Sequence, residues 1–219
     1  MINYKNIAAL ILCAGRSSRM GNFKPLLPLD KDNFIERTIR LYRSVDISNI
    51  LVVVGHEAEK IIPVLDGLEV NRVQNEHYDL GMFSSIQTGV RHLRGQCAAF
   101  FLHPADIPFV RPSTIKSLIA AFATGDMDIC RPCYKERYGH PPLISMSLYE
   151  AISEFDRAGG LRALLARHPQ KSCNVICNDP GILTDIDTPE DYEKALKSFS
   201  ESPGNPDQRV NVRLLDPKY

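Results

Sequence analysis

The sequence predicts an α/β protein in which helices cover both faces of a mostly parallel β-sheet. Two observations support this fold class. Short apolar runs recur through the first half of the chain, and a stretch of helical periodicity follows each of them. The first run, Ile7–Cys13, is wholly apolar, as expected for a strand buried on both faces. Alternation of this kind favours a single three-layer domain.

The first half of the chain contains four expected strands and four expected helices. The strands are expected at residues 7–13, 50–55, 68–74 and 97–102. The helices are expected at residues 33–43, 57–65, 83–93 and 112–123. Asn33 is a good N-cap for the first helix, and Pro63 is expected to end or kink the second.

The pattern changes after residue 133. A β-hairpin or irregular excursion is expected at residues 134–145, and short helices at 147–155 and 161–167. A strand at 172–177 and a helix at 188–199 follow, with Thr188 as N-cap and Pro189 at the first helical position. Ser, Pro, Gly and Asn then dominate, so we predict one domain over residues 1–199 and a mobile tail over 200–219.

Composition and charge argue against two kinds of partner. The 219 residues include 26 Lys plus Arg and 26 Asp plus Glu, so no basic field favours nucleic acid. No apolar run approaches the roughly 20 residues of a membrane span. The first residues lack the pattern of a signal peptide. We therefore expect a cytoplasmic protein that binds neither nucleic acid nor membrane.

The six cysteines include two short motifs. Cys130 and Cys133 form a CxxC motif, and Cys173 and Cys177 form a CxxxC motif. Such pairs are able to hold zinc. They lie in strand-like segments without a glycine-rich knuckle, which favours structural thiols over a zinc site.

The loop after the first strand indicates a phosphate-binding site. Ligands of parallel sheets bind at the carboxyl ends of the strands, where this loop begins. Small residues let the backbone come close to a ligand, and successive free N–H groups form an anion-binding nest. Two cations add charge that suits phosphate oxygens. The pattern is neither a Walker loop nor a GxGxxG fingerprint. The loop residues concerned are Ala14, Gly15, Ser17, Ser18, Arg19 and Lys24.

The same segment, from Leu12 to Pro28, resembles the signature of the MobA-like NTP transferases. It is most similar to the molybdenum-cofactor cytidylyltransferase branch, with the pattern LAAGxSxRMGxxKxLLP. This chain has Cys13 where that branch usually has alanine. It has Ala14 where the guanylyltransferase branch has a second glycine, and it lacks the DKG of that branch. The resemblance implies a Rossmann-like, GT-A-like fold.

The resemblance also assigns roles to the loop. It implies that the backbone of Leu12, Cys13, Ala14 and Gly15 holds the base and the ribose. It implies further that Arg19 and Lys24 hold the triphosphate and act in catalysis together with Asp106. A second segment is similar to the family pattern N-x-x-[WY]-x-x-G-M-x-x-S. The nucleotide-pocket residues that it implies are Asn75, Gly81, Met82, Ser84 and Ser85.

Two further segments carry candidate metal ligands. The segment His103–Pro108 resembles the family motif D-[MQ]-P, in which the aspartate, here Asp106, binds the catalytic metal. Residues 185–191 match D-I-[DN]-T-P-E-D, and we favour Asp187 as the second ligand, with Asp185 as the alternative. In an extended segment both carboxylates point the same way. Mg²⁺, or Mn²⁺, prefers such oxygen ligands.

The remaining matches concern the acceptor of the nucleotide. Residues 137–141 resemble the family's R-x-G-H-P, which implies that Gly139, His140 and Pro141 line the acceptor side. Residues 159–165 resemble an acceptor-side segment more loosely.

The resemblance implies a nucleotidyltransferase that moves CMP from CTP to the phosphate of a molybdopterin-type cofactor and releases pyrophosphate. A client molybdoenzyme is then a possible partner. Two alternatives stay open. The acceptor can be another phosphorylated small molecule, such as a sugar, polyol or choline phosphate. The chain can also be a non-catalytic binding or maturation factor for a pterin cofactor. Base choice, oligomeric state and client enzyme depend on contacts that the sequence does not place.

Overall fold

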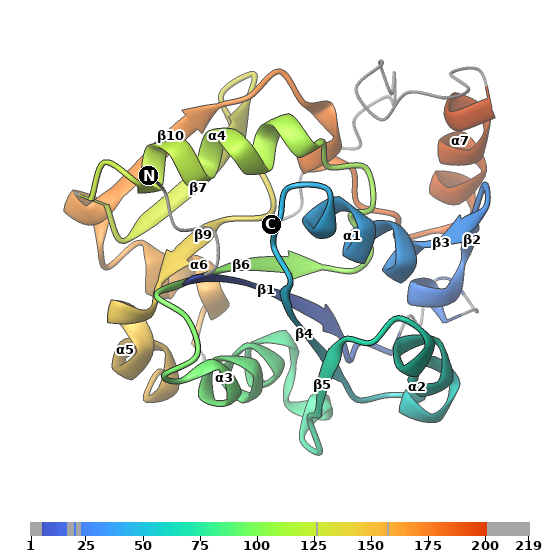
Figure 1. Ribbon diagram of the computed structural model, residues 1–219, viewed down its shortest axis with the longest axis horizontal. Helices are drawn as coiled ribbons and strands as arrows, with labels where there is room; N and C mark the ends of the chain where they lie inside the picture. The colour runs from blue at the N-terminus through green and yellow to red at the C-terminus, as the bar shows by residue number, and fades with distance from the viewer. Residues whose placement is uncertain (1–5, 17–19, 21–22, 126, 157, 201–219) are drawn as a thin grey trace.

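The computed structural model describes residues 6–16, 20, 23–125, 127–156 and 158–200 (Figure 1). Its main sheet contains β1 (Ile7–Cys13), β4 (Asn49–Val54), β5 (Asn71–Gln74), β6 (Ala99–Pro104), β7 (Ile129–Tyr134), β8 (Arg137–Tyr138), β9 (Leu143–Ser145) and β10 (Ser172–Ile176). A separate antiparallel pair is formed by β2 (Pro28–Leu29) and β3 (Asp32–Asn33).

The strand order confirms a mostly parallel sheet. The order is β10-β7-β9-β6-β1-β4-β5, and β8 pairs with β7. β1 is parallel to both of its neighbours, β4 and β6, and β10 is parallel to β7. The short strand β9 runs antiparallel between β6 and β7. The carboxyl ends of β1, β4, β5 and β6 therefore lie along one edge of the sheet, where a ligand site is expected.

Helices cover both faces of the sheet, as predicted. They are α1 (Phe34–Arg43), α2 (Ala58–Gly67), α3 (Met82–Leu93), α4 (Pro112–Phe122), α5 (Tyr149–Ser153), α6 (Gly160–Leu165) and α7 (Pro189–Ser200). Buried side chains of α1, α2 and α4 form one hydrophobic cluster with the sheet, and those of α3, α5 and α6 form the other. Figure 1 shows α1 and α4 on one side of the sheet and α3 and α5 on the opposite side.

The position of β1 in the middle layer explains why its sequence is apolar throughout. Successive side chains of a strand point to opposite faces of the sheet. Ala9 and Ile11 belong to one cluster, whereas Ala8 and Leu10 belong to the other, and all four are fully buried. A strand with a helix layer on each face has no position that favours a polar residue.

Some boundaries differ from those expected. The third strand begins at Asn71 because α2 continues to Gly67 and Leu68 caps its end. Pro63 lies inside α2 and does not end it. A proline removes one backbone hydrogen bond of a helix, and the burial of Ile61 and Leu65 against the sheet compensates for that loss.

The excursion after β7 is a tight β-hairpin. Tyr134 pairs with Arg137, which leaves Lys135 and Glu136 as a two-residue loop. Both loop residues have positive φ, 48° and 64°, as a type I′ turn requires. The usual Asn-Gly of such a turn is absent, which explains why the sequence left the choice between hairpin and irregular structure open.

The four cysteines of the two motifs lie on the neighbouring strands β7 and β10 or directly after β10. The Sγ atoms of Cys130 and Cys173 are 3.2 Å apart, and all six cysteines are free thiols. Within the described ranges, no helix is both long enough and apolar enough to cross a bilayer.

The last helix holds the segment that follows the glycine-rich loop. The hydroxyl of Tyr192 in α7 donates a hydrogen bond to the Pro28 carbonyl at 2.6 Å. Ala195 of α7 is buried in a small cluster with Leu29 and Phe34. In Figure 1, α7 lies at the end of the molecule beside β2 and β3. The predicted tail lies outside the described residues from position 201 onward.

Candidate active site

Two neighbouring parallel strands, β1 and β6, bring the glycine-rich loop and the predicted metal aspartate together. Leu12 of β1 is in register with Pro104 of β6, so both strands end at the same level of the sheet. The Ala105 amide donates a hydrogen bond to the Leu12 carbonyl at 3.1 Å, which extends the pairing by one residue. Asp106 follows at once, beside the start of the loop.

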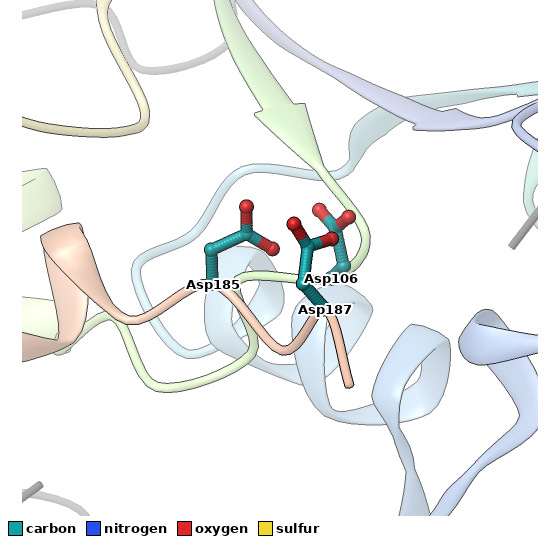
Figure 2. Close-up of side chains that lie close together, drawn as sticks. All are labelled: Asp106, Asp185 and Asp187. Carbon is teal, nitrogen blue, oxygen red and sulfur yellow. The ribbon is translucent and has the colours of Figure 1, made fainter. Parts of the chain in front are cut away.

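Three carboxylates meet at this edge of the sheet (Figure 2). Asp106, Asp185 and Asp187 each offer an oxygen, and these oxygens lie within 4.8 Å of one another. Ile186, between the last two, is 1% exposed, so the segment places both carboxylates together while the apolar side chain enters the core. The Ile186 amide donates to the Asp106 carbonyl at 3.0 Å, which joins the two segments.

Lys24 is the cation of this cluster. Its ammonium lies 2.5 Å from Asp187 Oδ1 and 3.3 Å from Asp106 Oδ2. Burial by itself lowers the pKa of Lys24, but Asp106, Asp187 and Asp185 outweigh burial and raise it. Lys24 is therefore positively charged at neutral pH, and the structure joins the predicted phosphate-binding lysine to the predicted metal ligands.

The start of α7 fixes the segment that carries Asp187. Thr188 and Asp191 form a reciprocal cap, in which the Thr188 amide donates to the Asp191 carboxylate at 3.1 Å. The Asp191 amide donates to the Thr188 hydroxyl at 3.2 Å. The predicted N-cap is confirmed. Because a helix N-terminus carries partial positive charge, it also stabilises the carboxylate of Asp187 directly before it.

A buried histidine holds the loop that carries Asp106. Nε2 of His103 donates to the Ile107 carbonyl, and Nδ1 accepts from the Tyr42 hydroxyl, each at 2.9 Å. The residue is fully buried, and burial lowers the pKa of His103 to about 4. The ring is therefore neutral near pH 7 with its proton on Nε2. Arg37 adds a second bond from α1 to this loop, to the Pro108 carbonyl at 2.9 Å.

The glycine-rich loop is partly described. Leu12, Cys13 and Ala14 are buried, whereas Gly15 is exposed. Burial, followed by the nearby Asp106, raises the pKa of the Cys13 thiol well above its usual range. The predicted residues Ser17, Ser18 and Arg19 lie outside the described residues.

The residues directly after β4 support this loop. The His56 amide donates to the Ala14 carbonyl at 3.3 Å. A Cβ atom on Gly55 would lie 2.8 Å from the Cβ of Ala14 and 2.9 Å from that of Tyr78. Only glycine allows the loop to approach so closely.

The predicted residues around Asn75 form an internal network. Asn75 Nδ2 donates to the hydroxyls of Ser84 and Ser85, at 2.8 and 2.9 Å, and all three residues are buried. Their side chains thus fix the turn into α3. Gly81 has a φ of 91°, a conformation that favours glycine, and Met82 beside it is 57% exposed. Of these five residues, Gly81 and Met82 are the ones that remain accessible to a ligand.

The predicted acceptor segment reaches the same edge. A Cβ on Gly139 would lie 2.3 Å from the Ile182 carbonyl oxygen, and the His140 amide donates to that oxygen at 2.9 Å. His140 precedes the buried Pro141. Burial lowers the pKa of His140, and the charge of Asp106 and a hydrogen bond with the Leu102 backbone oppose this effect. Nδ1 of His140 has no hydrogen-bond partner among the described residues.

Three residues beside the loop were not among the predicted ligands. The guanidinium of Arg16 lies 5.9 Å from the ring centroid of Tyr78, and the ring of His56 lies 5.8 Å from it. Arg16 is exposed and the other two are partly exposed. Their positions in the sequence offered a signal, because Arg16 lies inside the loop and His56 follows the carboxyl end of β4.

Comparison with known proteins gives consistent matches. The model of the MobA-like NTP transferase domain matches residues 9–172. A probable molybdenum cofactor guanylyltransferase of Natranaerobius thermophilus is 29% identical over 207 residues, which are 90% of this chain and 98% of the relative. The molybdenum cofactor cytidylyltransferase of Escherichia coli is 24% identical over 196 residues, 89% of this chain and 98% of the relative.

Solved structures share the fold. Rv0371c from Mycobacterium tuberculosis covers 89% of this chain and 100% of its own, with a TM-score of 0.74 and 24% identity. A structure of that protein in complex with manganese aligns with a TM-score of 0.69.

Proposed function

Since the chain belongs to the MobA-like NTP transferase family, we propose that it transfers CMP from CTP to the phosphate of a molybdopterin-type cofactor and releases pyrophosphate. One observation carries the proposal. Lys24 and three carboxylates lie together at the carboxyl edge of the sheet, beside the glycine-rich loop. The acceptor is proposed because curated relatives of almost full length are named for the molybdenum cofactor. CTP is proposed because Ala14 stands where the guanylyltransferase branch has a second glycine.

The carboxylates fit a divalent cation such as Mg²⁺ or Mn²⁺. Three oxygens within 4.8 Å of one another form the hard donor set that such ions prefer. Asp106 and Asp187 are the proposed ligands, and Asp185 is close enough to replace either of them. When bound, the cation would neutralise charge on the phosphates.

The chain's own contribution is position and charge. Transfer of this kind needs alignment of the acceptor oxygen with the α-phosphorus more than it needs covalent catalysis. The loop backbone at Ala14 and Gly15 holds the nucleotide, and Lys24 neutralises charge on the departing pyrophosphate. Arg19 is proposed to share this role. Gly81 and Met82 are proposed to border the base.

The acceptor is proposed to lie against Gly139, His140 and Pro141. Nδ1 of His140 has no hydrogen-bond partner among the described residues but is buried, so a bond from it to an acceptor oxygen would require a local rearrangement. A phosphate monoester is already ionised near neutral pH, so no strong general base is needed. His103 is excluded as a base because both of its ring nitrogens are bonded inside the core.

Ligand-dependent thermal stabilisation tests the nucleotide assignment. The protein is melted with CTP, GTP, ATP or UTP, each with and without Mg²⁺. A ligand at about 100 times its Kd adds about 2.7 kcal/mol. A Mg²⁺-dependent shift with CTP alone supports the proposal. A shift with GTP alone would support a nucleotidyltransferase that uses GTP instead of CTP, in line with the name of the guanylyltransferase relative. No shift with any NTP contradicts nucleotide binding.

Pyrophosphate release tests the reaction. With CTP, Mg²⁺ and molybdopterin, the wild type should release pyrophosphate, and Asp106→Asn should lower the rate by about 100-fold or more while the protein stays folded. Glu59→Gln, which changes an exposed carboxylate on α2, is the matched control and should keep the wild-type rate. Release with a sugar, polyol or choline phosphate in place of molybdopterin would reassign the acceptor. Normal turnover by Asp106→Asn would overturn the site.

A further inference from the structure

The ammonium of Lys24 bonds to the carboxylates that are proposed to hold the divalent cation. It lies 2.5 Å from Asp187 Oδ1 and 3.3 Å from Asp106 Oδ2. The Lys24 side chain is 10% exposed, whereas those of Asp106 and Asp187 are 29% and 18% exposed. The lysine thus lies on the inner side of the cluster, and the carboxylates face solvent.

An ammonium and a divalent cation compete at such a site. Both are stabilised by the same carboxylate oxygens, and they repel each other when they lie a few ångströms apart. A triphosphate offers Lys24 another anionic partner. The lysine side chain is a long flexible stem with a charged end, so it can exchange one partner for the other without backbone movement.

We propose that Lys24 is an internal counter-ion that keeps the carboxylate site from binding a free divalent cation, and that the NTP triphosphate draws it away. The cation then binds tightly only together with the nucleotide. This inference rests on the proposed function, because it requires the same site to receive a metal and a triphosphate. It adds an order of binding and gives Lys24 a role before the reaction begins.

Binding of Mn²⁺ without nucleotide tests the proposal directly. Free Mn²⁺ is measured by its electron paramagnetic resonance signal during titration of the wild type, Lys24→Met and Lys24→Arg. Lys24→Met keeps the length of the side chain and removes the charge, so it should bind Mn²⁺ about 10-fold more tightly than the wild type or better. Lys24→Arg keeps the charge and should bind as weakly as the wild type. Equal affinity in the wild type and Lys24→Met would overturn the proposal.

A second variant locates the site of the added affinity. Lys24→Met combined with Asp106→Asn should lose the gain, because one of the carboxylates is then neutral. Retention of the gain would place the ion elsewhere and would also overturn the proposal. Lys24→Gln replaces Lys24→Met if the latter fails to melt cooperatively.

The coupling between metal and nucleotide tests the second half of the proposal. Mn²⁺ affinity is measured in the presence of saturating α,β-methylene CTP, an analogue that cannot release pyrophosphate. The measurement is repeated with α,β-methylene GTP. The bound analogue should raise Mn²⁺ affinity in both proteins, but by a factor about 10 times larger in the wild type than in Lys24→Met. This ratio equals the gain in Mn²⁺ affinity that Lys24→Met shows without nucleotide. An equal factor in both proteins would contradict release of Lys24. These measurements need no turnover, so their failure differs from a failure of pyrophosphate release.

Discussion

The buried ring of His103 makes the stability of the fold depend on pH. Its pKa is about 4 in the folded chain, against an ordinary value of 6.5. Between these values the unfolded chain binds more protons, so stability should fall as pH falls from about 6.5 to about 4, by roughly 3 kcal/mol. His140, whose pKa is also lowered by burial, acts in the same direction.

His103→Gln tests this dependence by urea unfolding at about pH 7 and about pH 4.5. The side chain of glutamine has an NH2 group that can donate to the Ile107 carbonyl and an oxygen that can accept from the Tyr42 hydroxyl, and it does not titrate. The variant should lose less stability than the wild type on acidification, by about 2–3 kcal/mol. Equal losses in the two proteins would show that His103 is not the group responsible.

At the scale of single residues, the candidate charged side chains came from sequence motifs. Asp106, Asp187 and Lys24 were named from the sequence, and the structure brings them together. The two aspartates were expected to share one metal, but the ion pairs that Lys24 forms with both of them were not predicted, because they join segments that are far apart in the chain. Asn75 has a polar side chain like a ligand residue, but its hydrogen bonds close within its own turn. Only the fold distinguishes these two cases.

At the scale of elements, Gly139 packs closely against the 3₁₀ turn Pro180–Leu183, which leads into two of the three carboxylates. Gly139→Ala places a methyl group 2.3 Å from the Ile182 carbonyl oxygen, so the backbone has to move. We expect a loss of about 2 kcal/mol or more in urea unfolding. Because that turn leads into Asp185 and Asp187, pyrophosphate release should fall as well.

Gly15→Ala is the control for this substitution. A Cβ at Gly15 meets no atom within 4 Å among the described residues, so stability should change by less than about 0.5 kcal/mol. A similar loss of stability in Gly15→Ala and Gly139→Ala would contradict the steric explanation.

The cap of α7 gives a second prediction for an element. Thr188→Ala removes the hydroxyl that accepts from the Asp191 amide, and should lower the free energy of unfolding by about 1 kcal/mol. Thr188→Ser keeps the hydroxyl and should restore most of the loss. Wild-type stability of Thr188→Ala would show that the cap contributes nothing.

Helices and buried strands were predicted more accurately than the segments between them. The periodicity of α1 and α3 and the apolar run of β1 are local signals, and they were found within a residue or two. The antiparallel strand β9 has three residues, and its place between β6 and β7 is set by pairing with both. No local pattern encodes such a neighbour, so the order of the strands could not be read from the sequence.

For the whole molecule, the cysteines provide a test of packing. The chain has six cysteines, all of them free, and Cys173 is the one that is only partly buried. Burial raises the pKa of Cys97 to about 11, which makes its thiol unreactive. A thiol reagent such as DTNB should therefore label one equivalent quickly in the native protein and six in guanidinium.

Cys173→Ser should remove the fast phase of labelling. Several fast equivalents in the native wild type would mean that β7 and β10 open readily. Fewer than six equivalents in denaturant would show a disulfide or a modified thiol.

The fold class and the family were both predictable for the whole chain, and both are confirmed. Five short motifs in order identified the family, and alternation of strands and helices identified the architecture. The substrates could not be predicted in the same way, because one base or one acceptor is distinguished from another by a few contacts in loops. Ser17, Ser18 and Arg19, in the loop most concerned, lie outside the described residues.

The ion pair of Lys24 with Asp187 joins positions 163 residues apart in the chain. A ribosome makes Lys24 early and Asp187 late, and the strands between them can pair before the second partner exists. The growing polypeptide thus carries an incomplete centre for most of its synthesis, and α7 closes it near the end. A chain that is cut short before Thr184 keeps the strands of the sheet but loses two of the three carboxylates, so incomplete products lack the proposed active site.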